Sequence, residues 1–461
     1  MADQDQGLDR RSFLRSAGLT AVAGVVGYRD ASGASVTHPA FNPGPADGRF
    51  DFDTVYPRFG TDCIKYDQQV RTYGKGSIQV GMGIADMDFR AAPCITKALQ
   101  ERLGHENWGY LDMTAAGPVM AEAIAAWNKR RYGVAIDPAT IVFTNGVHPA
   151  LISVIQAFQP RGTKVLLATP AYDGFYVDLA FTGTLADESP MKFENGRYWM
   201  DYEDLERRIG PDTHLFILCN PHNPTGNCWS PEELTRIGEI CLRRRVVVLA
   251  DEIHCDFVSK GHKHTPFASL PNREIVNNSI SFNAASKSFN VSSHKVGWFY
   301  STNPDLLARV TPYVRHDITT LGMVANHAAY VEGEAWLSQA AAYIDGTHEL
   351  AASYIQDKIP GVKLSKAEAT YLCWLDVSDL MERIGASKLA DEHNRTKKAS
   401  DPARTPEMMM QRFFVERAGV HMNPGSAYGK GGGGHMRMNI ATSRKQVELA
   451  LGNIATAVRG L

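Results

Sequence analysis

The chain has 461 residues, of which 44% are hydrophobic and 21% charged, as in an ordinary globular protein with a sizeable core. Forty-eight lysines and arginines stand against fifty aspartates and glutamates, and the net charge of −2 excludes a strongly basic nucleic-acid binder and an acidic disordered tail. The seven cysteines form no CxxC pair, which excludes a disulfide framework and a zinc-finger spacing, so no metal site is predicted. No apolar run after the N-terminus reaches the roughly 18 residues of a membrane span.

The first 45 residues differ from the rest of the chain. They contain the string Asp-Arg-Arg-Ser-Phe-Leu-Arg at positions 9–15, a short apolar stretch over 17–27 and a connector rich in Pro and Gly over 39–48. This pattern resembles a twin-arginine export signal, and the alternative is a basic arm on a cytosolic protein. We expect residues 1–45 to be a signal and linker outside the fold. The expected location is then periplasmic or secreted, with the cytoplasm as the alternative.

From about Pro118 onward, helical and strand patterns alternate. Helices are predicted over 119–132, 149–158 and 231–245, the last with Ser230 as its N-cap. Strands are predicted over 141–144, 164–168, 215–219, 246–250 and 279–282. Because these strands are almost wholly apolar and lie between helices, they predict a parallel sheet covered on both faces, which is an α/β fold.

After about residue 325 the pattern changes to helices followed by mixed strands over 370–376 and 435–440. This predicts a second, smaller α+β domain. The expected division is 46–99 for the N-terminal part of the small domain, 100–325 for the large domain and 326–461 for the rest of the small domain. The polar segment 385–408 is predicted to be an exposed excursion.

Four predicted strands end in polar residues suited to chemistry. The strings at these four strand ends are Thr144-Asn-Gly-Val-His148, Asn220-Pro-His-Asn-Pro-Thr-Gly226, Asp251-Glu-Ile-His254 and Asn283-Ala-Ala-Ser-Lys287. A lone strand-end aspartate is usually a cap and a lone lysine is usually a solvated charge. In parallel sheets, however, ligands bind beyond the carboxyl ends of the strands, and these four ends come together there.

The four strand ends fit one ligand, pyridoxal 5′-phosphate. Its aldehyde needs an amine such as Lys287, and its ring nitrogen needs a carboxylate such as Asp251. Its phosphate needs backbone N–H groups at a helix start. Its ring needs an aromatic neighbour, which Tyr172 in Pro170-Ala-Tyr172 can supply.

From about residue 50 to 455 the chain resembles the class I/II aminotransferase group of pyridoxal-phosphate enzymes, fold type I. Within that group it is most similar to the cystathionine β-lyase-type C–S lyases. The strings that carry the resemblance are Ile84-Ala-Asp-Met-Asp-Phe89, Asn223-Pro-Thr-Gly226, Asp251-Glu-Ile-His254, Ser286-Lys-Ser-Phe-Asn290, Ala369-Thr-Tyr371, Pro424-Gly-Ser-Ala-Tyr-Gly429 and Arg437-Met-Asn439. The resemblance implies a large domain with a mostly parallel seven-stranded sheet between helices, plus a smaller α+β domain.

The resemblance also implies roles for individual residues. Lys287 forms the covalent link to the cofactor and later takes the Cα proton. Asp251 pairs with the ring nitrogen, Tyr172 stacks on the ring, Asn223 binds the ring hydroxyl and Arg437 binds the substrate carboxylate. The expected phosphate contacts are Gly146, Val147, Ser286 and His148, the last through its backbone N–H alone.

Two further positions carry alternatives. His254 either lies near the ring hydroxyl or is a structural histidine behind the site. Tyr110 matches a tyrosine that the family lends to the neighbouring subunit's phosphate, which implies a homodimer with shared sites; the alternative is a core tyrosine.

The chain departs from the lyase pattern at Asp173, at Lys295 and in the segment 79–83, which lacks the tryptophan that the lyases usually place there. Asp173 stands where the lyases usually have a second tyrosine, and it is either a contact for a substrate with a polar or cationic tail or a surface turn residue. Lys295 stands where the wider superfamily has a phosphate-binding arginine, so we expect it to contact the phosphate.

The leading functional prediction is a pyridoxal-phosphate-dependent C–S lyase that acts on an L-amino acid and releases a thiol, pyruvate and ammonia. The alternative is an aminotransferase for an amino acid with a polar or cationic side chain. A third possibility, from another class, is a cofactor-binding regulatory or interaction protein without turnover.

Overall fold

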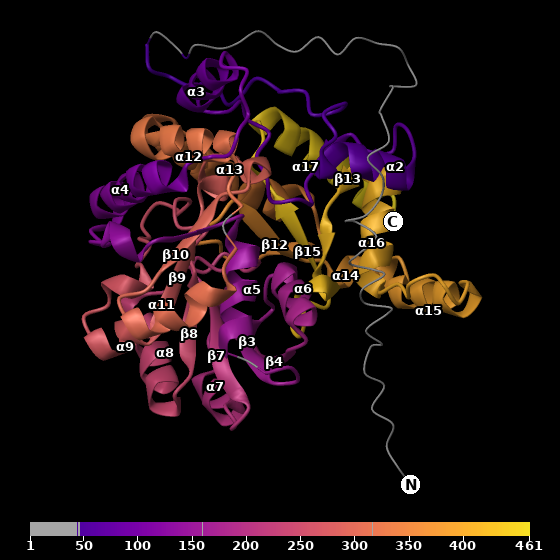
Figure 1. Cartoon of the computed structure of the whole chain (residues 1–461). Coiled ribbons are helices and arrows are strands. Elements are labelled where there is room, and N and C mark those ends of the chain that lie inside the picture. Colours follow the sequence, from indigo (N-terminus) through magenta and orange to yellow (C-terminus); the bar gives the residue numbers. More distant parts are fainter. Residues whose placement is uncertain (1–43, 45–46, 159, 316) are drawn as a thin grey trace.

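The computed structural model describes residues 44, 47–158, 160–315 and 317–461 (Figure 1). The predicted export signal and nearly all of the linker lie outside the described residues. Within the described ranges, no helix is both long and apolar enough to cross a membrane.

A seven-stranded sheet occupies the centre of the larger part of the molecule (Figure 1). Its strand order is β2-β10-β9-β8-β7-β3-β4. All neighbouring pairs are parallel except those of β10, which runs antiparallel to β2 and β9. The bounds are β2 Val142–Thr144, β3 Lys164–Thr169, β4 Leu185–Pro190, β7 Thr213–Cys219, β8 Val247–Asp251, β9 Ser279–Asn283 and β10 Gly297–Tyr300. The predicted α/β fold with a mostly parallel seven-stranded sheet is confirmed.

Helices cover both faces of this sheet because successive residues of its apolar strands point to opposite sides. In β7, Leu215 and Ile217 pack in the same cluster as α5 and α6, whereas Phe216 and Leu218 pack in the cluster of α8. A capping box between Ser230 and Glu233 starts α8, as the sequence predicts for Ser230. The helices of this part are α4 Met113–Tyr132, α5 Val147–Phe158, α6 Asp173–Thr182, α7 Tyr202–Arg208, α8 Pro231–Arg244, α9 Arg273–Asn277, α10 Ala285–Ser288 and α11 Pro304–Val310.

The C-terminal part builds a second, antiparallel sheet of four strands in the order β11-β12-β15-β14. Their bounds are β11 Lys363–Leu364, β12 Leu372–Asp376, β14 Asn423–Pro424 and β15 His435–Asn439. The accompanying helices are α12 Thr320–Glu332, α13 Glu334–Lys358, α14 Ser378–Arg383, α15 Ala386–Thr396, α16 Pro406–Ala418 and α17 Arg444–Arg459.

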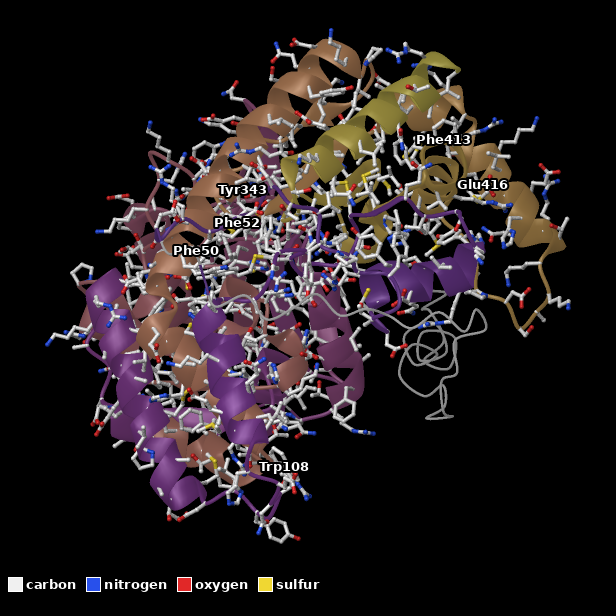
Figure 2. The ribbon with its side chains drawn as sticks, turned by 90° about the horizontal axis from the view of Figure 1, so that it is seen from above. Phe50, Phe52, Trp108, Tyr343, Phe413 and Glu416 are labelled. Carbon is white, nitrogen blue, oxygen red and sulfur yellow. The ribbon has the colours of Figure 1, made fainter. Side chains whose placement is uncertain are left out.

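The N-terminal segment returns to this second part. Strand β1 (Val80–Gly81) pairs in parallel with β13 (Val420–His421). Phe52 packs on Phe89, Trp336 and Tyr343, with ring centroids 5.0, 5.8 and 5.5 Å away, and Figure 2 shows Phe52 beside Tyr343. The remaining N-terminal elements are η1 Ile64–Gln68, α2 Gln69–Tyr73 and α3 Pro93–Leu103.

The segment 385–408 is largely exposed, as predicted, and α15 stands out from the body in Figure 1. It is not without structure of its own, because it contains α15 and the first turn of α16. Ala386 and Ala390 are buried against Met409 in a small cluster, which gives the helix one apolar face.

Candidate active site

A cavity of about 510 Å³ lies at the carboxyl ends of the central strands. Such a position follows from the topology, because β7, β8 and β9 run parallel and their polar following residues converge there. Ten of the predicted site residues line it: Gly146, Val147, His148, Tyr172, Asn223, Asp251, His254, Ser286, Lys287 and Lys295.

Lys287 extends from the short helix α10 into this cavity. Its Nζ donates a hydrogen bond to the carbonyl oxygen of Ala85 at 2.8 Å. Burial, together with the positive charge of Arg437, lowers the pKa of the Lys287 amine to about 8. A larger share of the amine is therefore neutral near pH 7 than in an exposed lysine, as a nucleophile or a base requires.

Asp251 is the last residue of β8 and is only 4% exposed. Its Oδ1 accepts a hydrogen bond from the backbone N–H of Ile253 at 3.2 Å. Burial raises the pKa of the Asp251 carboxyl to about 6. A cationic N–H group placed beside it would restore the carboxylate, so this position suits a protonated ring nitrogen.

The start of α5 lines the cavity and suits an anion, and we refer to its Gly146–Val147 backbone as the anion cradle. Gly146 has a φ of 122°, which favours glycine, and the helix begins at Val147. Gly297 of β10 packs so closely that a Cβ there would lie 2.6 Å from the Gly146 carbonyl carbon and 2.9 Å from the Val147 nitrogen. Ser286 and Lys295 line the same cavity, so the predicted phosphate contacts are brought together.

Arg437 is buried in β15 and is not itself one of the lining residues, but it contacts Asn223, which is one. One terminal nitrogen donates to Asn223 Oδ1 at 3.1 Å and the other to the Gly83 carbonyl at 2.8 Å. Its Nε has no hydrogen-bond partner although it is buried. An arginine with an unused donor beside Asn223 suits the binding of a carboxylate.

His254 lines the cavity and its buried Nδ1 has no hydrogen-bond partner. Its ring lies 5.7 Å from the ring of Tyr371. Burial, with the charges of Lys287 and Arg437, holds the pKa of His254 well below the ordinary value, so the ring is neutral. Of the two alternatives for this residue, the structure favours a position in the cavity over one behind it.

Asp173 and Tyr110 lie outside the residues that line the cavity. Asp173 is the first residue of α6, directly after Tyr172. Tyr110 is fully exposed on the segment between α3 and α4, so the alternative of a core tyrosine is wrong. Trp108, labelled in Figure 2, lies on the same segment and is 50% exposed. The Arg102 guanidinium lies over its ring, 4.5 Å from the centroid.

The loop 83–88 belongs to the site although its residues were assigned no role from the sequence. The Ala85 carbonyl accepts hydrogen bonds from Lys287 and from the Tyr371 hydroxyl, the latter at 3.0 Å. Asn439 Nδ2 donates to the carbonyls of Ile84 and Asp86, both at 2.6 Å. The only sequence signal for this loop was the resemblance of the strings 84–89, 369–371 and 437–439 to the family. That resemblance did not indicate which residues hydrogen-bond to one another.

A buried ion-pair cluster fastens this loop from behind. Lys65 is fully buried, and its Nζ contacts Asp88 at 2.9 Å and Asp86 at 3.5 Å. Arg58 contacts the same two carboxylates at 2.7 and 2.9 Å. Paired charges of this kind hold one arrangement firmly, because the loss of one partner leaves a buried charge uncompensated. No sequence pattern indicated this cluster.

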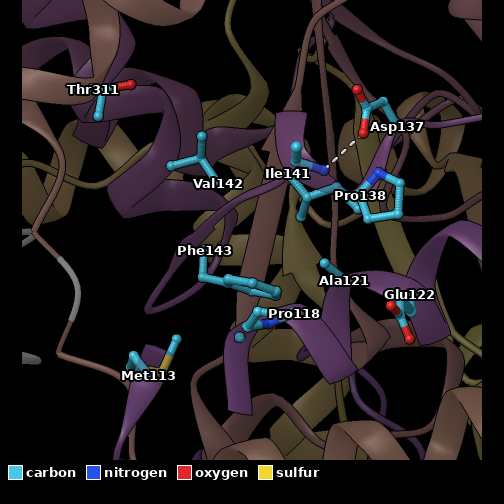
Figure 3. A pocket seen from close by; sticks show the side chains of 12 residues that line it. Met113, Pro118, Ala121, Glu122, Asp137, Pro138, Ile141, Val142, Phe143 and Thr311 are labelled. Carbon is cyan, nitrogen blue, oxygen red and sulfur yellow. Dashed lines mark hydrogen bonds between the residues drawn. The ribbon is translucent and has the colours of Figure 1, made fainter. Parts of the chain in front are cut away.

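A second cavity, of about 700 Å³, lies between α4 and β2 (Figure 3). Its lining is largely apolar, and its two ionisable residues are Glu122 and Asp137. The Asp137 carboxylate is engaged as an N-cap for Ala139. The lining offers neither an amine nor a histidine, so the smaller, polar cavity is the candidate active site. Among the described residues no three His, Cys, Asp or Glu side chains are grouped as metal ligands.

Comparisons with known proteins cover nearly the whole described chain. The sequence matches the family described as aminotransferase class I and II over residues 77–454. It is 35% identical over 415 residues to the cystathionine beta-lyase PatB of Bacillus subtilis, covering 88% of this chain and 100% of the relative. It is 27% identical to the protein MalY of Escherichia coli over 420 residues, or 89% of this chain and 100% of the relative.

Two solved structures show the same fold. A pyridoxal-phosphate-bound putative aminotransferase from Clostridium difficile is 32% identical with a TM-score of 0.79, over 89% of this chain and 100% of that chain. Cystalysin from Treponema denticola, which contains a pyridoxal 5′-phosphate cofactor, is 25% identical with a TM-score of 0.80, over 89% of this chain and 99% of that chain. The likeness extends through both parts of the fold.

Proposed function

The chain belongs to the aminotransferase class I and II family, and we propose that it is a pyridoxal 5′-phosphate-dependent C–S lyase. It would act on an L-amino acid with a sulfur at Cβ, of the cystathionine or cysteine-conjugate type, and release a thiol, pyruvate and ammonia. The observation that carries this proposal is the convergence of the Lys287 amine, the Asp251 carboxylate and the start of α5 on one cavity.

The residues of this cavity fit the cofactor. When bound, pyridoxal 5′-phosphate supplies an aldehyde for an amine and a ring that accepts electrons from the substrate. Lys287 is the amine, Asp251 is the partner for the ring nitrogen, and the backbone at Gly146 and Val147 is the anion cradle. The unpartnered Nδ1 of His254 is a buried polar atom on a residue of the lining, and a bound molecule in this cavity can satisfy it.

Different residues of the site have different roles in the proposed reaction. Arg437 holds the substrate carboxylate and so fixes which bond at Cα is aligned for cleavage. Lys287, with its pKa lowered to about 8 by burial and by Arg437, takes the Cα proton onto its Nζ. The Ala85 carbonyl, 2.8 Å from that Nζ, holds the amine in place.

The lyase is favoured over the aminotransferase by the relatives. A cystathionine beta-lyase is 35% identical over its full length, and a C–S lyase of Staphylococcus hominis has the same fold with 28% identity and a TM-score of 0.76. The alternative, an aminotransferase for a polar or cationic amino acid, rests on Asp173 and Lys295. The third alternative, a regulatory protein without turnover, would not need Lys287, Asp251 and Arg437 together.

A spectral experiment separates these alternatives. The visible spectrum of the protein loaded with pyridoxal phosphate is recorded before and after addition of L-cystathionine. A lyase returns to its starting spectrum when the substrate is consumed, because the cofactor is regenerated in each turnover. An aminotransferase without a 2-oxo acid acceptor ends in the pyridoxamine form and loses the visible band. A spectrum that never responds to any amino acid contradicts both enzyme proposals.

We propose further that the enzyme is a homodimer in which each subunit lends Tyr110 to the other's phosphate site. The support is the full exposure of Tyr110 on a segment that Arg102 braces through hydrogen bonds to the carbonyls of His105 and Asn107. The test is complementation. Mixing the inactive variants Lys287→Ala and Tyr110→Ala should restore activity through hybrid dimers, which carry one intact site. No recovery on mixing contradicts shared sites.

The location is a proposal that rests on the sequence alone. The paired Arg10 and Arg11 support export by the twin-arginine route, which carries folded proteins and so lets a cofactor be loaded beforehand. The double substitution of Arg10 and Arg11 by lysine should retain the protein in the cytoplasm, as fractionation would show. A cytoplasmic wild-type protein contradicts export.

A further inference from the structure

The imidazole of His148 lies between the Asp178 carboxylate, which has no role in the proposed reaction so far, and the hydroxyl of Tyr172, whose ring is expected to stack on the cofactor. Its Nδ1 is 2.8 Å from Asp178 Oδ2, and its Nε2 is 3.3 Å from the Tyr172 hydroxyl. The His148 and Tyr172 rings are 5.6 Å apart between centroids, tilted by 42°. The sequence predicts a role for the backbone N–H of His148 alone, whereas the structure shows that its side chain also contacts two residues.

Asp178 fixes the orientation of this imidazole. Asp178 lies one turn into α6, is 2% exposed, and has its carboxylate directed at His148 Nδ1. A carboxylate accepts hydrogen bonds and does not donate them, so Nδ1 carries a hydrogen in both charge states of the ring. Only Nε2 changes, from a donor in the protonated ring to an acceptor in the neutral ring.

The packing makes Gly174 part of the same arrangement. A Cβ at Gly174 would lie 2.5 Å from His148 Cε1 and 2.5 Å from Tyr172 Cε1. Both rings therefore rest against the α6 backbone at a residue that has no side chain. This close contact limits how far either ring can turn.

The charges around His148 raise its pKa above the ordinary value of a histidine. Burial opposes protonation, but the hydrogen bond and charge of Asp178, with the charge of Asp251, outweigh it and raise the pKa of His148, against the opposing charge of Lys287. The His148 side chain is still 45% exposed, so it exchanges protons with solvent. The groups that face it are thus Asp178 on α6, Asp251 on β8, Lys287 on α10 and the Tyr172 hydroxyl.

We propose that His148 is a positioning residue for Tyr172 and that its protonation sets the direction in which the Tyr172 hydroxyl donates. The protonated ring donates from Nε2 to the phenol oxygen and leaves the phenol hydrogen free for a group in the cavity. The neutral ring accepts at Nε2, so the phenol hydrogen turns to His148 and is withdrawn from the cavity. Asp178 holds the His148 ring in the same orientation in both charge states. This inference rests on the proposed function, in which Tyr172 stacks on the cofactor.

The test compares three variants of the holoenzyme across about pH 5 to 8, the range in which histidines titrate. His148→Gln retains a group that can hydrogen-bond the Tyr172 hydroxyl but cannot titrate. His148→Val removes the hydrogen bond altogether. His435→Gln is the matched control, since His435 Nε2 is also 3.3 Å from a tyrosine hydroxyl, that of Tyr198, and its Nδ1 is also bonded, at 2.8 Å from the Gly433 carbonyl.

Two readouts are followed. The visible absorbance of the bound cofactor should show a titration step in wild type and in His435→Gln that is missing in His148→Gln. The ratio of wild-type kcat to His148→Gln kcat cancels the titration of Lys287, which both share, and should fall as pH rises through the His148 pKa. His148→Val should lose about tenfold in kcat, the effect of one hydrogen bond, with a much smaller change in KM.

A purely structural role for His148 predicts different results. In that case His148→Gln keeps the absorbance step, or the kcat ratio stays flat with pH, and either result overturns the inference. Loss of the step in His435→Gln as well would also overturn it. If the wild-type protein binds pyridoxal phosphate and cleaves substrate, these results count against the inference alone. If wild type acquires no visible band with the cofactor, the proposed function fails and the inference falls with it.

Discussion

At the scale of single residues, burial tunes the acid and base groups of the site in opposite directions. The Lys287 amine and the Asp251 carboxyl are both enclosed, and burial disfavours the charged form of each. The pKa of Lys287 falls to about 8 and that of Asp251 rises to about 6. Burial thus gives the Lys287 amine a larger neutral fraction near neutral pH than an ordinary lysine has, and this prepares it for chemistry.

Replacing Lys287 by alanine should therefore stop turnover while leaving the fold intact. We expect kcat to fall by at least about a thousandfold, because both the covalent link to the cofactor and the base are lost. Thiol release from L-cystathionine measures the effect, and circular dichroism checks the fold. Lys260→Ala, which removes a lysine from the lining of a different cavity, is the control and should keep wild-type activity. A Lys287→Ala enzyme within tenfold of wild type would falsify the assignment.

Asp251→Asn tests the role of the Asp251 carboxylate. The amide keeps the shape and the hydrogen bond but supplies no negative charge for a ring N–H. We expect kcat to drop by about 10²–10⁴-fold, as for other groups that stabilise charge during reaction, with a smaller change in cofactor affinity. Steady-state kinetics at saturating cofactor measure this. An unchanged kcat would show that the carboxylate does not face the ring nitrogen.

At the scale of elements, the site depends on close contact between backbones. Strand β10 runs against the direction of its neighbours and brings Gly297 onto the first turn of α5. The contact leaves no space for a Cβ at Gly297. The anion cradle can therefore occupy this position only because the strand residue behind it is a glycine. A glycine within a strand usually marks such a close approach.

Gly297→Ala should accordingly weaken cofactor binding. Overpacking of this kind costs about 1–3 kcal/mol, which corresponds to a rise in the cofactor Kd of about 5- to 150-fold if the backbone at Gly146 and Val147 absorbs the shift. Titration of the apoprotein with pyridoxal phosphate, followed by tryptophan fluorescence, measures the Kd. Gly452→Ala in α17, where a Cβ meets its nearest atom at 3.5 Å, is the matched control. Equal affinities for the two variants would contradict the cradle.

The sequence predicted the strand ends of this site because each apolar strand is followed by polar residues, and parallel topology brings such ends together. It could not predict contacts between residues that are far apart in the sequence, because no motif or spacing indicates them. Lys287 and the Ala85 carbonyl are 202 positions apart, and the acceptor is a backbone atom that any residue possesses. Asp178 was missed for another reason, since an aspartate inside a helix ordinarily faces solvent. The orientation of Arg437, held by Asn223 and by a carbonyl of the same loop 83–88, likewise depends on packing between the two sheets.

At the scale of the whole molecule, several histidines are buried in the neutral state. Burial lowers the pKa of His264 to about 3 and those of His222 and His421 to about 4. In the unfolded chain these groups titrate near 6.5, so their contribution to stability is complete above about pH 6.5 and is lost as pH falls toward 4. Glu252, whose pKa burial raises to about 8, acts in the opposite sense, because the neutral form of a carboxyl is its protonated form and acid favours it.

We therefore expect acid to destabilise the fold well before the carboxylates titrate, and His264→Phe to reduce that effect. Each such histidine contributes about 1.4 kcal/mol of lost stability per pH unit below about 6.5. His264 packs edge-on against Tyr132, and its buried Nδ1 has no partner, so an aromatic ring can replace it. Urea unfolding at pH 7.5 and at acid pH measures the slope, and the value at pH 7.5 controls for altered packing. An unchanged slope would contradict the neutral buried state of His264.

The central claim is that the two parts of this fold enclose a pyridoxal-phosphate site that breaks a C–S bond. The most direct measurement is the stoichiometry of products from L-cystathionine with the purified, cofactor-loaded protein. The claim predicts thiol and pyruvate in equal amounts, each matching the cystathionine consumed, with no 2-oxo acid that retains the sulfur. Consumption of cystathionine with an intact sulfur-containing 2-oxo acid and no thiol would contradict it and make the protein an aminotransferase.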